Sequence, residues 1–420
     1  MKITDVKTVL LTGPCTDDPY LSELRKVRSA AFIRIETDTE LIGVGETYAG
    51  YFFPEGVPPI VDFFKPILIG CNVDDIPALW QRMYHAGNFW CRVGLGAIVL
   101  AGIEAALWDL RGKELKLPVY KILNGAWGKE FPEASIRTNG SMGNVGLPCY
   151  ATGGPSNYPF DKLYQKVEFY CAEGFKGVKL GAGAFSIEDG LMINSGPSAA
   201  ADHEAKKAEF IRTQFGDDLW FMIDGHMGNS SEVTWGLETA TAVAKALEPY
   251  NLFFLEEPLH YTRPDLYAKL CQETDTPIAG GECLTAVCEW QTFIDQQCFN
   301  IGQPDASFTS GLDQFMQVAA LLAQSGRRIA THAWGAGGSL MQNIHAGFAC
   351  PNIAILEFAP AYGPLHREVI GEDLQIKHGH LLPPEKPGLG IELTDKTIQK
   401  FPFKPGTGEF NSVPGKILTS

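Results

Sequence analysis

The hydrophobic positions in the middle of the chain form short apolar runs, each of which ends in a carboxylate. The runs occupy residues 220–223, 252–255 and 277–281, and the acids that follow them are Asp224, Glu256 and Glu282. Segments with helical patterns separate the runs, which is typical of consecutive strands in a parallel βαβ array. The carboxyl ends of such strands meet at one face of a barrel. We therefore expect the three acids to lie together.

The same pattern extends to both sides and predicts an eight-stranded barrel. We place the strands at residues 134–139, 176–180, 220–224, 252–256, 277–282, 299–305, 328–332 and 353–357. From Asp224 onward the strand ends are 32, 26, 23, 27 and 25 residues apart, which suits a repeated unit of strand, turn and helix. The first helix is predicted at 160–173. Irregular segments are predicted at about 140–159 and at 181–202.

The part before the barrel has a different pattern. Residues 1–12 and 29–48 read as antiparallel strands, and a helical pattern follows to about residue 123, clearest at 96–113. These elements predict an α+β unit ahead of the barrel. The tail after residue 358 is irregular, and we expect it to pack back on this unit. The predicted boundaries are 1–128 for the N-terminal unit, 129–358 for the barrel and 359–420 for the tail.

Composition narrows the class of protein. The 420 residues are 45% hydrophobic and 20% charged, as in an ordinary globular protein. The net charge of −15 and the lack of a basic cluster argue against nucleic acid or an anionic membrane as partners. The sequence shows no signal-peptide pattern and no apolar run of about 18 residues. Ten scattered cysteines without metal spacing suggest reduced thiols and a cytoplasmic location.

Three converging carboxylates repel one another unless a positive charge lies between them. A hard divalent cation with oxygen ligands would satisfy Asp224, Glu256 and Glu282, and Mg²⁺ fits best. The alternative is that each acid pairs with a surface lysine or arginine. A substrate carboxylate bound to this Mg²⁺ would be stabilised as its dianion when a proton leaves the neighbouring carbon.

Other predicted strand ends also carry polar groups, namely Lys179, Asp305, His332 and Glu357. Lys179 would add to the stabilisation of the dianion. Asp305 and His332 lie on neighbouring strands and suit a hydrogen-bonded acid/base dyad, although a core histidine bonded to a carbonyl remains the alternative. Glu357 is expected to hydrogen-bond to substrate, or else to form a structural salt bridge.

Two further residues are candidates because of their neighbours. His226 stands two places after Asp224 and shares its face if the strand continues, whereas an exposed loop histidine is the alternative. Trp334 stands two places after His332 and lines either the substrate pocket or the barrel rim.

Taken together, these motifs resemble the enolase superfamily and, within it, the mandelate racemase-like subgroup. The motifs are AALWDLRGK at 105–113, GFKGVK at 174–179, ID at 223–224, FLEEP at 254–258, GE at 281–282, QPD at 303–305 and THAW at 331–334. The resemblance implies an α/β fold, a (β/α)₇β modified TIM barrel with an α+β capping domain, and one Mg²⁺ per active site. It also implies removal of the proton α to a carboxylate and a homo-oligomer, from dimer to octamer.

The resemblance also implies roles for single residues. Asp224, Glu256 and Glu282 match the metal ligands, the pair Asp305 and His332 matches the acid/base dyad, and Glu357 matches the eighth-strand electrophile. The family often has Lys-x-Lys on the second barrel strand, but here Gly181 replaces the second lysine, which weakens a racemase reading. The Asp-x-His string at 224–226 resembles the dehydratases for sugar acids such as galactonate and mannonate.

The resulting hypothesis is a Mg²⁺-dependent lyase that dehydrates an aldonate or aldarate to a 2-keto-3-deoxy acid through a metal-stabilised enolate. One of His226 and His332 would take the α-proton, and the other or the same one would protonate the leaving hydroxyl. Lys179, His226, Glu357 and Trp334 would contact substrate. The alternatives are a racemase or epimerase of a 2-hydroxy acid, with His226 as second base, and a non-catalytic sugar-acid binding protein. Specificity is expected from residues 13–28, 48–55, 140–160 and 181–202.

Overall fold

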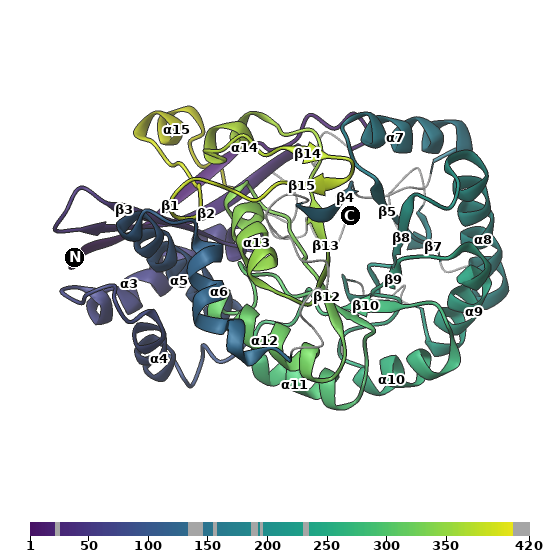
Figure 1. Ribbon diagram of the computed structural model, residues 1–420, viewed down its shortest axis with the longest axis horizontal. Coiled ribbons are helices and arrows are strands. Elements are labelled where there is room, and N and C mark those ends of the chain that lie inside the picture. The colour runs from purple at the N-terminus through teal and green to yellow at the C-terminus, as the bar shows by residue number, and fades with distance from the viewer. Residues whose placement is uncertain are drawn as a thin grey trace.

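An eight-stranded parallel barrel lies beside a smaller antiparallel sheet that has its own helices (Figure 1). The computed structural model describes residues 1–21, 26–132, 146–153, 158–185, 192–193, 196–229 and 235–405. Within these residues, the arrangement confirms the predicted α/β barrel with a separate N-terminal capping unit.

The N-terminal unit packs a three-stranded sheet against helices. Its strands are, in spatial order, β1 (Ile3–Pro14), β2 (Val27–Thr37) and β3 (Ile42–Thr47). Its helices are α2 (Ala49–Phe52), α3 (Val57–Leu68), α4 (Ile76–Ala86), α5 (Leu95–Leu115) and α6 (Val119–Trp127). The predicted helix at 96–113 is α5, and β3 lies so close to it that a Cβ on Gly45 would be 2.4 Å from the carbonyl oxygen of Gly102. Glycine is what permits this approach.

The barrel alternates strands and helices, and each strand except the last is followed by a helix. The strands are β4 (Leu147–Thr152), β5 (Gly177–Gly181), β8 (Trp220–Asp224), β9 (Phe254–Glu256), β10 (Ile278–Gly280), β11 (Ile301–Gly302), β12 (Arg328–Ala330) and β13 (Ile353–Phe358). The helices are α7 (Phe160–Ala172), α8 (Gly196–Phe215), α9 (Leu237–Leu247), α10 (Pro264–Glu273), α11 (Val287–Asp295), α12 (Leu312–Gln324) and α13 (Gly338–Ala349). Pairing of β13 with β4 closes the ring.

The inside of the barrel is filled by one cluster of buried side chains. Its members are Tyr150, Met222, Phe254, Ala279, Ile301, Ala330, Ala354 and Ile355. Strand residues two apart share a face, so the acids two places after Met222, Phe254 and Ile355 also point inward. The strand period therefore directs acidic side chains to the carboxyl end of the barrel.

Three predicted segments differ from the structure. The first barrel strand is β4, which lies inside the segment predicted to be irregular at 140–159, whereas the strand predicted at 134–139 lies outside the described residues. The residues of β4, LPCYAT, lie in a stretch that is rich in glycine and proline, and this composition concealed the strand. Helix α8 begins at Gly196, so residues 196–202 are helical rather than irregular; the short strands β6 (Ala184–Phe185) and β7 (Met192–Ile193) precede it. Helix α2 lies within residues 48–55, one of the segments from which specificity is expected.

The tail contains short elements that touch both parts of the molecule. They are α14 (Pro364–Val369), β14 (Ile376–Lys377), β15 (His380–Leu381) and α15 (Asp395–Lys400). Strand β15 pairs with the start of β4 in the barrel. After α15, the backbone nitrogen of Thr12 in β1 donates to the carbonyl oxygen of Phe401 at 3.3 Å, and the backbone nitrogen of Lys404 donates to Thr12 Oγ1 at 2.9 Å.

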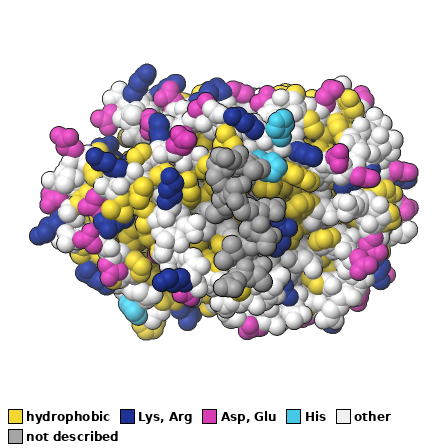
Figure 2. Space-filling view, viewed as in Figure 1, with side chains coloured by type: hydrophobic (Ala, Val, Ile, Leu, Met, Phe, Trp, Pro, Cys, Tyr) yellow, Lys and Arg dark blue, Asp and Glu magenta, His cyan; other side chains and the backbone are white. Residues whose placement is uncertain are grey.

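Two surface properties bear on partners. On the face shown in Figure 2, lysine and arginine side chains are dispersed among aspartate and glutamate rather than gathered in one patch. In the described part of the chain, no helix is long and apolar enough to cross a membrane.

Candidate active site

Lys179 lies at the centre of the predicted acidic site. From β5 its ammonium nitrogen reaches Glu256 Oε2 at 2.7 Å, Glu357 Oε1 at 2.9 Å and Asp224 Oδ2 at 3.0 Å. All four side chains are at most 5% exposed. The carboxyl ends of β5, β8, β9 and β13 thus bring together four of the predicted site residues, and the lysine supplies the positive charge that the acids require.

The charges in this cluster depend on one another. Burial raises the pKa of Glu256 well above its usual range, and the nearby Asp224 adds to that effect. Burial would also raise the pKa of Asp224, but His226 and Lys179 outweigh it and the pKa of Asp224 is lowered. Burial would lower the pKa of Lys179, yet Asp224 and Glu256 raise it well above its usual value. The lysine is therefore held as a cation.

The donor atoms suit a divalent cation. Among the described residues, Glu256 Oε1 is buried without a hydrogen-bond partner, and Asp224 Oδ2 forms an ion pair with Lys179. An unsatisfied buried carboxylate oxygen is costly, and a cation bound there would remove that cost. Within the described residues, however, Glu282 is grouped with Glu257 and Cys283 rather than with the other two predicted ligands, the donor atoms of this group lying within 4.8 Å of one another.

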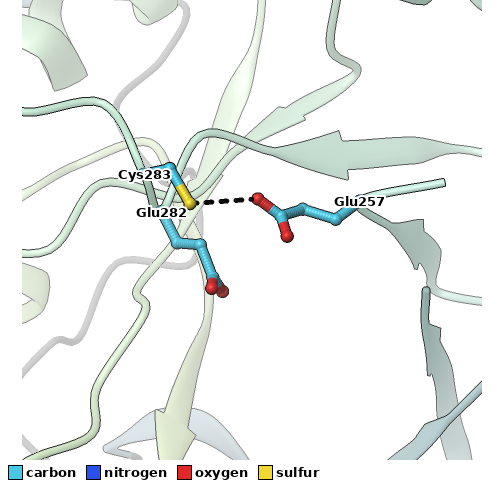
Figure 3. A group of neighbouring side chains, drawn as sticks. All are labelled: Glu257, Glu282 and Cys283. Carbon is cyan, nitrogen blue, oxygen red and sulfur yellow. Dashed lines mark hydrogen bonds between the residues drawn. The ribbon is translucent and has the colours of Figure 1, made fainter. Parts of the chain in front are cut away.

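Figure 3 shows this second group at the ends of β9 and β10. The Cys283 thiol donates to Glu257 Oε1 at 3.5 Å, and the Glu282 side chain lies beside them. Burial and the neighbouring Glu282 raise the pKa of Glu257 well above its usual range. Glu257 has a positive φ of 38°, an uncommon conformation for a residue with a side chain. This conformation at the end of β9 accompanies a Glu257 carboxylate that lies within 4.8 Å of the donor atoms of Glu282 and Cys283.

Asp305 and His332 form the predicted dyad. His332 Nδ1 lies 2.8 Å from Asp305 Oδ2, and His332 Nε2 lies 3.7 Å from Glu282 Oε2. Burial would lower the pKa of His332, but Glu282 and the hydrogen bond that the ring donates to Asp305 raise it to about 10. A cation bound to Glu282 would remove the largest influence that keeps this imidazole protonated. The ring would then be free to accept a proton at Nε2.

The dyad is supported by residues that the sequence did not single out. Asp305 Oδ1 accepts hydrogen bonds from the backbone nitrogen and hydroxyl of Ser307, both at 2.7 Å, and from the Asn343 amide at 2.8 Å. These bonds fix the carboxylate, so that Oδ2 is directed to His332. The Tyr48 ring lies edge-on to His332 with centroids 5.5 Å apart. The aromatic residues at 48–53 were a signal in the sequence for the Tyr48 contact, but the contacts of Ser307 and Asn343 had no such signal.

Both oxygens of Glu357 are occupied. Oε1 pairs with Lys179, and Oε2 accepts a hydrogen bond from the backbone nitrogen of Ala333 at 2.7 Å. Burial would raise the pKa of Glu357, but Lys179 and His332 outweigh it and lower the pKa. Glu357 is therefore a carboxylate that forms a salt bridge with Lys179. Its expected hydrogen bond to substrate stays a prediction.

His226 reaches Asp224 by a different route from the one expected. Strand β8 ends at Asp224, and His226 takes a left-handed conformation with φ 48°. Its backbone nitrogen donates to Asp224 Oδ1 at 3.0 Å, and its Nδ1 lies 3.3 Å from the same oxygen. The side chain remains 41% exposed. His226 thus stands at the edge of the site, beside Asp224 and partly accessible to solvent.

Trp334 contacts the capping unit. Its indole nitrogen donates to the Tyr51 hydroxyl at 3.1 Å, and its ring packs on the Arg28 guanidinium, whose central carbon is 3.8 Å from the ring centroid. The aromatic side chains at 48–52 therefore cover the His332 side of the barrel mouth.

Family comparisons agree with this geometry. Residues 21–124 match the mandelate racemase / muconate lactonizing enzyme N-terminal domain, and residues 162–397 match the enolase C-terminal domain-like family. The chain belongs to the enolase superfamily. Within it, the mandelate racemase-like relatives have the same pairing of a capping domain with a barrel.

Several relatives of this mandelate racemase-like member are named sugar acid dehydratases. The D-galactonate dehydratase of Verminephrobacter eiseniae is 30% identical over 87% of this chain and 89% of its own. The arabinonate dehydratase of Saccharolobus solfataricus is 29% identical over 88% and 90%. The crystal structure of L-talarate dehydratase from Polaromonas sp. JS666, complexed with Mg and L-glucarate, is 26% identical with a TM-score of 0.76 over 96% and 98%.

Proposed function

We propose that the protein is a hydro-lyase that dehydrates a sugar acid, an aldonate or aldarate, to the corresponding 2-keto-3-deoxy acid. The observation that carries this proposal is the presence of two imidazoles next to predicted metal ligands, with His332 Nε2 3.7 Å from Glu282 and His226 Nδ1 3.3 Å from Asp224. Dehydration needs a base for the α-proton and an acid for the departing hydroxyl. The names of the relatives support the same reaction class.

We also propose that the site holds a divalent cation, Mg²⁺ best of all, on Asp224, Glu256 and Glu282. The donors are all carboxylate oxygens, which suits a hard cation, and Glu256 Oε1 is buried and unsatisfied. When bound, the cation supplies positive charge for the substrate carboxylate as negative charge develops there. Glu282 would have to turn from the Glu257 group to complete this set.

The side chains of the site then carry out the proton transfers. His332 accepts the C2 proton at Nε2, while Asp305 holds its Nδ1–H and stabilises the imidazolium. Lys179 lies beside the carboxyl end of the substrate and stabilises the negative charge left by that proton. The C3–oxygen bond then breaks as His226 donates a proton to the hydroxyl, which departs as water. The resulting enol takes a proton at C3 and becomes the 2-keto acid.

The alternative of racemisation requires a base on each face of the substrate carbon. Gly181, where the family often has a lysine, carries no titratable group, and its carbonyl oxygen accepts from Lys207 at 2.8 Å. His226 would have to serve as that second base. Recovery of an epimerised acid instead of a keto product would favour the racemase reading.

A panel of acid sugars tests the proposal. Purified protein with Mg²⁺ is assayed for 2-keto-3-deoxy products and, in D₂O, for exchange of the α-proton. Replacing both His226 and His332 by Asn should abolish exchange, whereas His85→Asn, an exposed histidine on α4, should leave it unchanged. Survival of exchange in the double variant would refute the assigned bases. Ligand-induced stabilisation without any turnover would favour a binding protein.

A further inference from the structure

Glu46 is a buried glutamate of the N-terminal unit that contacts the barrel. It lies on β3 and is 2% exposed. Its Oε1 accepts a hydrogen bond from the backbone nitrogen of Ala336 at 2.9 Å, and its Oε2 accepts one from the backbone nitrogen of Ser339 at 2.8 Å. Helix α13, which begins at Gly338, lies on the side of the barrel that faces the N-terminal unit (Figure 1). The carboxylate therefore satisfies backbone N–H groups at the start of a barrel helix, where the helix dipole favours a negative charge.

The fit between Glu46 and α13 is close. The backbone nitrogen of Glu46 donates to Gln342 Oε1 at 2.7 Å, so this residue contacts the first two turns of the helix. Glycine permits the approach, because a Cβ on Gly338 would lie 2.7 Å from the Glu46 Cβ and one on Gly335 would lie 2.9 Å from Glu46 Oε1. The hydrogen bonds to Glu46 thus fix the position of α13 and of the segment that precedes it.

The same turns of α13 hold the aspartate of the dyad. Ser339 Oγ lies 2.6 Å from Ser307 Oγ, and the Ser307 hydroxyl donates to Asp305 Oδ1 at 2.7 Å. One turn later, the Asn343 amide donates to Asp305 Oδ1 at 2.8 Å, and its own oxygen accepts from the backbone nitrogen of Ala306 at 2.8 Å. Positions four apart lie on one face of a helix. The face that carries Ser339 and Asn343 therefore determines where the Asp305 carboxylate lies.

Glu46 is connected to both members of the dyad. It holds the backbone at Ala336, four residues after His332, and through Ser339 it holds the helix that fixes Asp305. Burial raises the pKa of Glu46 to about 7, although hydrogen bonds from Ser339 and Ala336 oppose the rise, and the negative charge of Asp305 adds to it. Above pH 7 the side chain is therefore mainly the carboxylate, which accepts both hydrogen bonds.

We propose that Glu46 is a positioning residue for the acid/base dyad: its carboxylate fixes the start of α13, and α13 in turn fixes Asp305 and the segment that carries His332. This inference rests on the function proposed above. The N-terminal unit thereby contributes to the proton transfer through a barrel helix, without contact with the reacting atoms.

Glu46→Gln tests the proposal, because it keeps the shape of the side chain but places an amide NH₂ group opposite a backbone N–H group. At pH 8 this change should lower kcat for the sugar acid, and the rate of α-proton exchange in D₂O, by about tenfold with little change in KM. Glu46→Asp keeps the charge with a shorter reach. It should have the same effects to a smaller extent, so it replaces Glu46→Gln if that variant does not fold.

Glu104→Gln is the matched control. Glu104 lies on α5 and is also buried, and its carboxylate accepts from the backbone nitrogens of Leu312 and Asp313 at the start of α12. Ser339 and Asn343, which hold Asp305, lie on α13 and not on α12. Glu104→Gln should therefore lose stability, as Glu46→Gln does, but keep its kcat.

Two measurements separate positioning from a loss of stability. In the Asp305→Asn background, Glu46→Gln should lower the exchange rate no further, because the group on which it acts has been removed. The second measurement needs no substrate. In protein labelled with ¹⁵N-histidine, the proton between His332 Nδ1 and Asp305 gives a downfield NMR signal, which is assigned by its loss in Asp305→Asn. Glu46→Gln should shift or broaden this signal, and Glu104→Gln should leave it unchanged.

The outcomes distinguish this proposal from the proposed function. An unchanged kcat or an unchanged NMR signal in Glu46→Gln, or an equal loss of kcat in Glu104→Gln, would overturn the positioning role while the dehydratase stands. A further tenfold loss in the Asp305→Asn background would also overturn it. If no sugar acid is turned over, the dehydratase fails and the NMR signal decides. A change in Glu46→Gln that is absent in Glu104→Gln supports the positioning role, and identical signals refute it.

Discussion

Replacement of Lys179 by Met should reveal how strongly the acidic centre depends on a cation. The lysine forms ion pairs of 2.7–3.0 Å with three buried carboxylates. Removing one partner of a buried ion pair costs about 3–5 kcal/mol, because the remaining charge is left uncompensated. We therefore expect Lys179→Met to lower the free energy of unfolding in EDTA by about that amount. Catalysis should fall by at least about 100-fold, since the stabilising charge is lost.

Added Mg²⁺ should reduce the difference in the free energy of unfolding between Lys179→Met and the wild type. The cation would replace the lost positive charge beside Asp224 and Glu256, so it should recover more stability in Lys179→Met than it adds to the wild type. Urea unfolding followed by circular dichroism, with EDTA and with Mg²⁺, measures both differences. Lys207→Met is the control, because Lys207 is also buried but, among the described residues, forms an ion pair with one carboxylate, that of Glu204, at 2.9 Å. Mg²⁺ should not rescue it.

Two results would refute this reasoning. If Lys179→Met is as stable as the wild type in EDTA, the three carboxylates do not need the lysine charge in the folded protein. If Mg²⁺ stabilises wild type, Lys179→Met and Lys207→Met equally, the cation binds elsewhere. Either outcome would remove the physical basis for placing the metal at this centre.

Three further predictions concern neighbouring parts of the structure. Asn343→Ala should lower kcat about tenfold with little change in KM and should shift the pH profile, because Asp305 loses one fixed donor; an unchanged profile would argue against a positioning role. Glu256→Gln should abolish the rescue of EDTA-treated enzyme by Mg²⁺, which titration calorimetry would detect as lost binding. Burial lowers the pKa of His345 to about 3. Between pH 6.5 and 3, His345 therefore binds a proton in the unfolded state but not in the folded state. The folded protein loses stability as the pH falls through this range. His345→Gln should flatten this loss between pH 6.5 and 4.5 in urea unfolding; an equal slope would contradict it.

Local sequence patterns were sufficient to predict much of the barrel. The apolar runs located the strand ends, and the structure places Asp224, Glu256 and Glu357 around Lys179. Glu282, which was expected to lie with Asp224 and Glu256, is instead grouped with Glu257 and Cys283. Strand β4 was missed because its run, LPCYAT, contains a proline and lies between glycines, which indicated an irregular segment instead of a strand.

The contacts that shape the site could not be predicted, because they join distant parts of the chain. Arg28 and the carbonyl of Gly335 are 307 residues apart in sequence. The left-handed turn of His226 was equally hidden, since histidine gives no local signal for a positive φ. The sequence suggested that His226 contacts Asp224 because the strand continues past Asp224. In the structure the strand ends at Asp224, and the turn that follows brings His226 to it. These contacts depend on how the backbone folds in space, which local composition does not indicate.

The tail has a practical consequence for anyone who wishes to exchange modules between members of this superfamily. Strand β15 extends the barrel sheet, and the segment after α15 hydrogen-bonds to β1. Residues 380–404 therefore connect the barrel to the N-terminal unit. A chimaera that takes only its N-terminal residues from a relative would place a foreign β1 against the native segment that follows α15. A graft from a relative should therefore include both the N-terminal unit and the tail after the barrel. An exchange of substrate preference between relatives then requires the exchange of two segments.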